Sequence, residues 1–221
     1  MKKFIFRAFL IIVSIGVLLG IWIAFDLYRP HKIDIREFDA NEIARLDTEM
    51  WRSYYAKERL KMFSQLTEVL EKQYKLPFWR RQLMAFYAAK AAFVFKDGKE
   101  RTDYEKALPD LRKFYGEIHD ISTTNFDVEK AAKLELEWWI VHRERKKYQE
   151  GDLAKALAEN AAAIYNIPSE KFLEYGKYRA DAMKIRDDNA ETGGVTEEDW
   201  QKIDELLHKS WNSLHKTINN E

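Results

Sequence analysis

The chain opens with one continuous run of hydrophobic residues, and apolar and polar residues are mixed throughout the remainder. The run extends from Ala8 to Phe25, AFLIIVSIGVLLGIWIAF, and contains no charged residue. A helix of about 18 residues is roughly 27 Å long, close to the thickness of a bilayer's hydrocarbon core. No small-residue cleavage site follows the run. The pattern therefore predicts that residues 1–28 form a single transmembrane helix that is retained as an anchor.

A linker is expected at residues 29–39, and a soluble domain at residues 40–221. In that domain, apolar residues recur with helical spacing, and no segment shows the convincing alternation of a strand. Capping residues and helix breakers divide it into about seven helices. These are expected at residues 40–74, 78–95, 102–118, 128–148, 152–165, 169–192 and 197–218.

Several helix starts are predicted from side chains that cap exposed backbone amides. Asp39 followed by Glu42, Thr102 by Glu105 and Thr196 by Asp199 have the spacing of capping boxes, and Asp127 and Ser169 are predicted as single caps. Pro109 falls inside the third helix, so that segment is expected to kink or to form two short pieces.

The predicted fold is all-α, with one transmembrane helix followed by a helical bundle. Short connections favour a bundle, because they make successive helices antiparallel neighbours. A helical-repeat solenoid is the alternative, since residues 106–108 and 155–157 both read Lys-Ala-Leu. The helix at residues 78–95 is mostly apolar and is expected at the centre of the domain.

Composition and charge exclude several classes of function. The chain has no cysteine, which excludes disulfides, thiolate catalysis and cysteine-ligated metal sites. Without Lys2, Lys3 and Arg7, 34 basic residues face 37 acidic ones, so the soluble part is mildly acidic. A nucleic-acid-binding protein would carry a basic excess or stripe, and no nucleic-acid partner is expected.

Charges flanking the hydrophobic run bear on its orientation in the membrane. Lys2, Lys3 and Arg7 favour a cytoplasmic N-terminus, which places the soluble domain outside the cytoplasm, in a periplasmic or extracellular space. Three basic residues that follow the run weaken this bias: Arg29, Lys32 and Arg36.

Small residues form a candidate packing face on the membrane helix. Gly16 and Gly20 form a GxxxG motif, and Ala24 extends the same face by a turn. Such residues let two helix backbones approach closely in lipid. The expected partner is another transmembrane helix, from a second copy or from another subunit; the alternative is that the face packs against nothing in particular.

A candidate site for a cofactor lies in the segment LELEWWIVHRER. Glu135, Trp138 and His142 share one helix face, where they would line a metal, haem or organic ligand. However, Glu135 and His142 are roughly 10 Å apart along the axis, too far to ligate one metal without other helices. The favoured interpretation is that the tryptophans pack in the core while the charged residues form ion pairs, and no cofactor is predicted.

Two further segments have a specific chemical interpretation. Glu205 and His208 form a Glu-x-x-His motif, a component of di-iron helical bundles, but such sites need two copies and this chain has one. The segment Phe78-Trp79-Arg80-Arg81, if exposed, suits the lipid headgroup region; alternatively, its aromatic rings turn inward.

Taken together, the sequence predicts a non-enzymatic, membrane-anchored helical protein that serves as an interaction or accessory subunit of a membrane assembly. The domain has no glycine-rich phosphate loop, GxSxG elbow, HExxH motif or EF-hand pattern. The alternative is a helical bundle that binds a metal, a haem or an apolar ligand. A helical scaffold for peptides is a third possibility.

Overall fold

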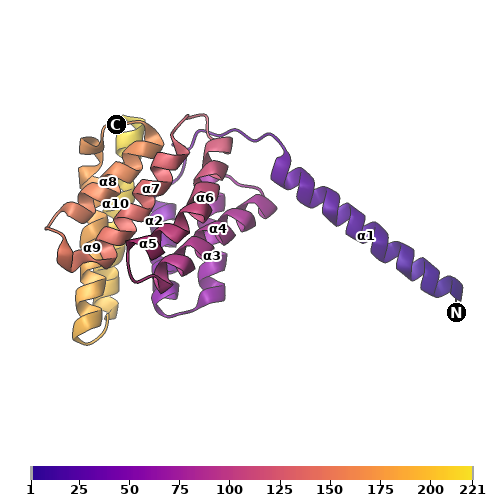
Figure 1. Ribbon diagram of the computed structural model, residues 1–221, viewed down its shortest axis with the longest axis horizontal. Helices are drawn as coiled ribbons and strands as arrows, with labels where there is room; N and C mark the ends of the chain where they lie inside the picture. The colour runs from indigo at the N-terminus through magenta and orange to yellow at the C-terminus, as the bar shows by residue number, and fades with distance from the viewer. Residues whose placement is uncertain (1, 221) are drawn as a thin grey trace.

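The first helix stands apart from a compact helical body. The structure, a computed structural model, describes residues 2–220 and is all-α, with no strand among those residues. Helix α1 (Lys2–Tyr28) extends away from the domain formed by the later helices (Figure 1). The predicted fold class, a long N-terminal apolar helix followed by a helical bundle, is confirmed.

The domain consists of α-helices joined by short turns and three short 3₁₀ segments. The α-helices are α2 (Ala40–Tyr55), α3 (Arg59–Tyr74), α4 (Phe78–Asp97), α5 (Arg101–Tyr104), α6 (Leu108–Ile121), α7 (Val128–Arg143), α8 (Asp152–Tyr165), α9 (Leu173–Thr192) and α10 (Glu197–Asn219). The 3₁₀ segments are η1 (Glu105–Ala107), η2 (Arg145–Lys147) and η3 (Ser169–Phe172).

The long helices pack in chain order, and the last packs against the first of the domain. Helix α2 contacts α3, α3 contacts α4, α4 contacts α6, and the series continues through α7, α8, α9 and α10. Helix α10 then packs extensively against α2. This return contact closes the arrangement into a bundle, whereas an open solenoid would leave its two ends apart.

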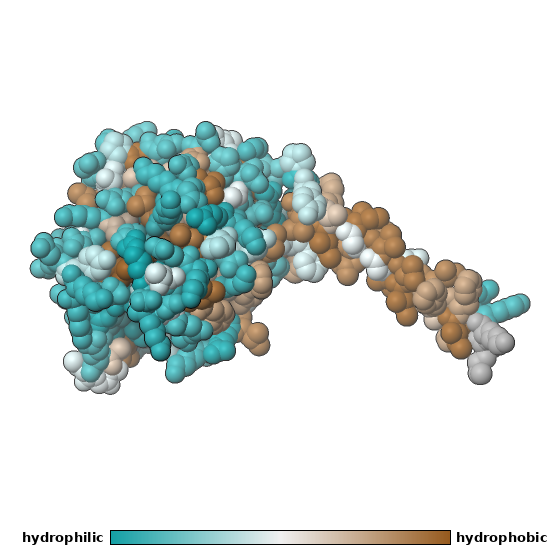
Figure 2. Space-filling model, in the orientation of Figure 1, coloured by the Kyte–Doolittle hydropathy of each residue, from teal (hydrophilic) through white to brown (hydrophobic). Residues whose placement is uncertain are grey.

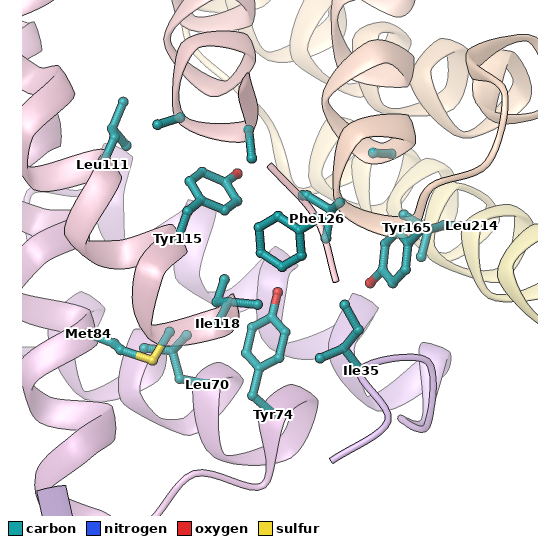
Figure 3. Close-up of a cluster of buried hydrophobic side chains, with 14 of the residues drawn as sticks. Ile35, Leu70, Tyr74, Met84, Leu111, Tyr115, Ile118, Phe126, Tyr165 and Leu214 are labelled. Carbon is teal, nitrogen blue, oxygen red and sulfur yellow. The ribbon is translucent and has the colours of Figure 1, made fainter. Parts of the chain in front are cut away.

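The main core is rich in aromatic rings contributed by helices distant in the sequence. Tyr74 from α3, Tyr115 from α6 and Tyr165 from α8 are buried around Phe126 (Figure 3). Aromatic side chains bury large areas and suit such a junction. A second, smaller cluster lies between α2, α9 and α10 and contains Trp51, Ala182, Met183, Ile203 and Leu207.

The prediction of one helix over residues 40–74 is wrong. The chain turns back at Ala56–Glu58, where Lys57 adopts a left-handed conformation with φ of 62°, and α3 packs against α2. A single helix of that length would be about 50 Å long and would leave its apolar stripe without partners. Folding back buries Val69 and Leu70, although neither glycine nor proline marks the turn.

Three predicted N-cap residues are confirmed, although at Asp39 the reciprocal half of the predicted capping box is absent, because the Glu42 carboxylate binds Arg45 instead. The Asp39 carboxylate accepts hydrogen bonds from two backbone amides in the first turn of α2, and Asp127 accepts one from the Lys130 amide. Thr196 and Asp199 form the predicted reciprocal capping box at the start of α10.

Two other predicted helix starts differ. The Thr102 hydroxyl donates to Glu100, so the predicted capping box with Glu105 is absent. Ser169 does not cap a helix; it begins the 3₁₀ segment that precedes α9. The predicted interruption near Pro109 is confirmed, because α5 and η1 precede α6 and the proline lies in the first turn of α6, where a missing N–H costs nothing.

The helix expected over residues 78–95 at the centre of the domain lies instead with one face at the surface. Helix α4 contacts α3, α6 and η1 as well as α1 and α5, but one of its faces is left uncovered. Phe86 and Phe93 are 53% and 47% exposed, whereas Met84 and Ala91 are fully buried. Core packing therefore does not account for all of its apolar side chains.

Residues 29–39, expected as a linker, are packed on the domain. The side chains of Ile33, Ile35 and Phe38 are buried. Backbone hydrogen bonds join Ile33 to the segment after α6, with Ile33 N–H donating to Ile121 O at 2.8 Å and Ile33 O accepting from Thr123 N–H at 2.9 Å. The chain between α1 and α2 thus follows a defined path.

Candidate functional site

The surface of α1 is apolar and uncovered by the rest of the chain. Residues Lys3–Tyr28 form the one helix, among the described residues, that is long and apolar enough to cross a membrane. Figure 2 shows its hydrophobic surface standing clear of the largely hydrophilic domain. Apart from the adjacent backbone of α1 itself, a Cβ added at Gly16 or Gly20 would meet no described atom within 4 Å, and Ala24 is exposed. The predicted packing face is therefore open.

The C-terminal end of α1 is docked on the start of α4. The buried carboxylate of Asp26 accepts a hydrogen bond from the backbone N–H of Trp79. The Trp22 ring stacks on Phe78 at 5.9 Å between centroids and meets Trp79 edge-on at 5.5 Å. We call these four residues the joint: Trp22, Asp26, Phe78 and Trp79.

Asp26 acts as a cap supplied from 53 residues away. The N-cap position of α4 is Pro77, which has no side-chain group to satisfy the first amides. A carboxylate placed there satisfies a free N–H and lies at the positive end of the helix dipole. The joint therefore fixes the direction of α1 relative to the domain.

Replacing Asp26 with alanine should loosen the joint, because the free amide in the first turn of α4 loses its acceptor. We expect a loss of about 0.5–2 kcal/mol, the usual value of a helix cap. In the full chain, this loosening should appear as faster hydrogen exchange of the Trp79 backbone amide. The matched control is Asp39→Ala, which removes the cap of α2. Unchanged exchange in Asp26→Ala, or equal acceleration in both variants, would contradict the assignment.

The structure brings together two of the three predicted cofactor-binding residues, Glu135 and Trp138. The Glu135 carboxylate accepts from Trp138 Nε1 at 2.9 Å, from Trp139 Nε1 at 2.9 Å and from the Tyr115 hydroxyl at 2.8 Å. Asn160 in turn donates to the Tyr115 oxygen at 3.3 Å. Both carboxylate oxygens are thus already used within the protein, an arrangement that ties α7 to α6 and α8.

Burial raises the pKa of Glu135 above its usual 4.5, although the three donors oppose the shift. The folded state therefore holds this proton to a higher pH than the unfolded state does. The stability contributed by Glu135 should fall as the pH rises from about 4.5 through the folded pKa, and should be constant above it.

Denaturant unfolding of the full chain and of a Glu135→Gln variant would measure this dependence. The difference in their free energies of unfolding should change within that pH window and be flat at neutral pH, because all other groups titrate equally in both. Parallel profiles throughout would show that the Glu135 pKa is the same in the folded and unfolded states.

His142, the third predicted residue, is paired elsewhere. Its Nε2 lies 2.9 Å from Asp187 Oδ2 on α9, and Arg186 donates to the other oxygen at 2.8 Å. Burial opposes ionisation of Asp187, but hydrogen bonds from His142 and Arg186 outweigh it and lower the pKa of the carboxyl. The Arg186 guanidinium also lies 3.3 Å above the Tyr55 ring. His142 therefore joins α7 to α9.

Glu205 and His208 lie on α10 without forming a ligand set. Glu205 is exposed and lines an open polar hollow of about 380 Å³ between α2 and α10. His208 Nδ1 lies 2.9 Å from the backbone oxygen of Asp204. Within residues 2–220, no group of three or more His, Cys, Asp or Glu side chains is arranged to hold a metal ion.

A buried ion pair that the sequence analysis did not identify links α2, α9 and α10. Arg179 Nη1 lies 2.6 Å from Asp47 Oδ2, which also accepts from Trp211 Nε1 at 2.8 Å. The guanidinium is placed between two indole rings, 5.4 Å from Trp51 and 5.8 Å from Trp211. Together these contacts join the return helix α10 to the first helix of the domain.

Weak signals for the missed residues do exist in the sequence. Asp47 lies between Ile43 and Trp51 at i, i+4 and i+8, so a charge occupies an apolar face of the helix. Asp26 is the first charge after the hydrophobic run, and Pro77 begins a helix without a capping side chain. Neither signal identifies its partner, because each partner lies far away in the chain.

The comparisons with known proteins provide no family to which these features can be assigned. No protein-family model, no curated protein and no solved structure matches this chain.

Proposed function

We propose that this protein is a membrane-anchored, non-enzymatic interaction subunit of a membrane assembly. The observation that carries the proposal is the combination of an uncovered apolar helix with a built joint. Helix α1 exposes most of its apolar surface, whereas its C-terminal end is held to the domain through Asp26 and Trp22. A removable targeting segment or a flexible tether has no need of such a joint.

The polar clusters of the domain support a structural role rather than chemistry. Glu135 accepts from Tyr115 on α6, His142 is bonded to Asp187 on α9, and Asp47 accepts from Arg179 on α9 and from Trp211 on α10. Catalytic groups need a free reacting atom beside a cavity that admits substrate. These side chains instead hold helices together, which is what a rigid interaction module requires. The alternative of a ligand-binding bundle on the Glu135 face has no such support.

The partners proposed for α1 are the lipid bilayer and another transmembrane helix, contacted through Gly16, Gly20 and Ala24. Small residues at this spacing permit close backbone packing. A double variant, Gly16→Leu with Gly20→Leu, should disrupt assembly in mild detergent, measured by size-exclusion chromatography with light scattering and by mass spectrometry of co-purifying proteins. Ser14→Leu adds a large apolar side chain roughly 120–160° away from the two glycines around the helix and serves as the control.

The outcomes of this experiment distinguish a second copy of the chain from another subunit as the partner of α1. A self-association that is lost in the glycine variant identifies a second copy as the partner, and loss of a co-purifying protein identifies another subunit. A wild-type chain that is monomeric and alone at every concentration would refute the proposal of an interaction subunit.

The proposed orientation places the N-terminus in the cytoplasm and the domain outside it, in the periplasm or extracellular space. The supporting observation is the cluster Lys2, Lys3 and Arg7 on the short tail. Since the chain has no cysteine, single-cysteine variants report topology directly. A membrane-impermeant maleimide should label Lys216→Cys but not Lys3→Cys in intact cells or spheroplasts, and the reverse pattern would invert the topology.

A further inference from the structure

The outward face of α4 carries aromatic side chains where a surface helix normally carries charges. Phe78, Phe86 and Phe93 are 43%, 53% and 47% exposed. Arg80, by contrast, is buried and lies 2.8 Å from Glu117. Helical residues seven or eight positions apart share a face, so the three rings form a band roughly 22 Å long. We call this set of three phenylalanines the aromatic stripe.

Basic side chains accompany the stripe. The Arg81 guanidinium lies 5.4 Å from the Phe78 ring, and the Arg59 guanidinium lies 5.9 Å from the Phe93 ring. Beside the stripe on the same helix, the Tyr87 ring has the Lys113 ammonium at 5.4 Å. Aromatic rings flanked by cations are typical of protein surfaces that lie in the headgroup region of a membrane.

Some of these charges are neutralised within the protein and some are not. Arg81 is paired with Glu71, and Lys90, which borders the stripe, lies 3.1 Å from Asp110. Arg59 and Lys113 have no carboxylate within ion-pair distance in the part of the chain that the structure describes. Arg59 and Lys113 therefore place two positive charges beside the stripe, although the soluble part of the chain as a whole is mildly acidic.

The stripe begins at the joint with the membrane helix. Phe78 stacks directly on Trp22, six residues before the end of α1 at Tyr28. Trp22, Phe25 and Tyr28 are all exposed near this end, where aromatic residues mark the level of the lipid headgroups. The contact with Trp22 holds the first turn of α4 at the same level, so the stripe continues a surface that α1 already presents to lipid.

We propose that the aromatic stripe of α4 docks in the headgroup region of a bilayer rich in anionic lipid, alongside the membrane helix. The inference rests on the proposed anchoring by α1 and specifies how the domain sits on that membrane. The phenylalanine rings enter the interface, while Arg59 and Lys113 contact lipid phosphates. This surface explains why an apolar helix of the domain leaves one face uncovered.

The test uses the full chain with one cysteine introduced at a time. Phe86→Cys, Phe93→Cys and, as a matched control on the remote helix α10, Lys216→Cys are each labelled with an environment-sensitive fluorophore. The proteins are reconstituted in phosphatidylcholine vesicles with or without about 30% phosphatidylglycerol, and nitroxide lipids labelled near the headgroup serve as quenchers. Co-sedimentation with the vesicles reports anchoring by α1 independently.

The expected result is that the labels at positions 86 and 93 lose about half of their emission in anionic vesicles, and less without the anionic lipid, whereas the label at position 216 loses none. Energy transfer between labels at position 86 on separate copies, without quenching by lipid, would show that a second copy covers the stripe and would overturn the proposal. If the protein is bound to vesicles but shows neither quenching by lipid nor energy transfer between copies, the stripe lies in water. That result would also overturn the proposal. A chain that fails to co-sediment would instead refute the anchoring itself.

Discussion

Replacing Asp47 with alanine is expected to lower the free energy of unfolding by about 3–5 kcal/mol, the usual cost of removing one partner of a buried ion pair. The substitution leaves the Arg179 guanidinium enclosed between two indole rings without its carboxylate. It also leaves the Trp211 N–H without its acceptor. Denaturant unfolding of the full chain in mild detergent, followed by tryptophan fluorescence, would measure the loss.

The control lies on the same helix. Arg45 pairs with Glu42 and Glu49 on the exposed side of α2, and surface pairs of this kind contribute at most about 1 kcal/mol. Arg45→Ala should therefore change stability far less than Asp47→Ala. A double variant, Asp47→Leu with Arg179→Met, should recover much of the loss because it removes both charges together. Equal effects of Arg45→Ala and Asp47→Ala would contradict the buried pair.

Gly176→Ala is expected to cost at least about 1–3 kcal/mol, because it forces two packed helices apart. An added Cβ at this position would lie 2.1 Å from the backbone oxygen of Ala154 on α8. No rotation of a side chain relieves a clash with backbone, so α8 and α9 must separate. Denaturant unfolding of the full chain should show a lower denaturant concentration at the unfolding midpoint.

Gly116→Ala is a matched substitution that is expected to raise the stability of the protein instead of lowering it. Gly116 lies in the middle of α6, and an added Cβ there meets no atom within 4 Å. Alanine is the better helix former by about 0.5–1 kcal/mol, so this variant should be more stable than wild type. A loss of stability in Gly116→Ala would show that helix propensity does not govern that position, and unchanged stability in Gly176→Ala would contradict the close approach at Ala154.

Much of the fold follows from interactions between residues near one another in the chain. The caps at Asp39 and Asp127 and the capping box of Thr196 bond to amides two or three residues away, and all three were predicted. The turn at Ala56–Glu58 was missed because neither proline nor glycine marks it. Packing of α3 against α2 decides that turn, and such packing outweighs the local preference to continue a helix.

In the candidate sites, too, contacts within one helix were predicted and contacts between distant helices were not. The face shared by Glu135 and Trp138 was predicted, since its spacing follows from helix geometry. The pairing of His142 with Asp187 was not, because the two residues are 45 positions apart. The exposure of one face of α4 was also missed, because the apolar composition of a helix does not show which of its faces the rest of the protein covers.

The order of hydrophobic and polar residues alone specified the long apolar segment at Ala8–Phe25, the all-helical domain and most of the helix ends. Each of these depends on the length of a run, on helical periodicity or on a hydrogen bond within one turn. Tertiary structure alone decided that Asp26 caps α4, that Arg179 reaches Asp47, and that α10 returns to α2. The physical reason is that these contacts join residues far apart in the chain, and their partners are selected by the burial and packing of whole helices.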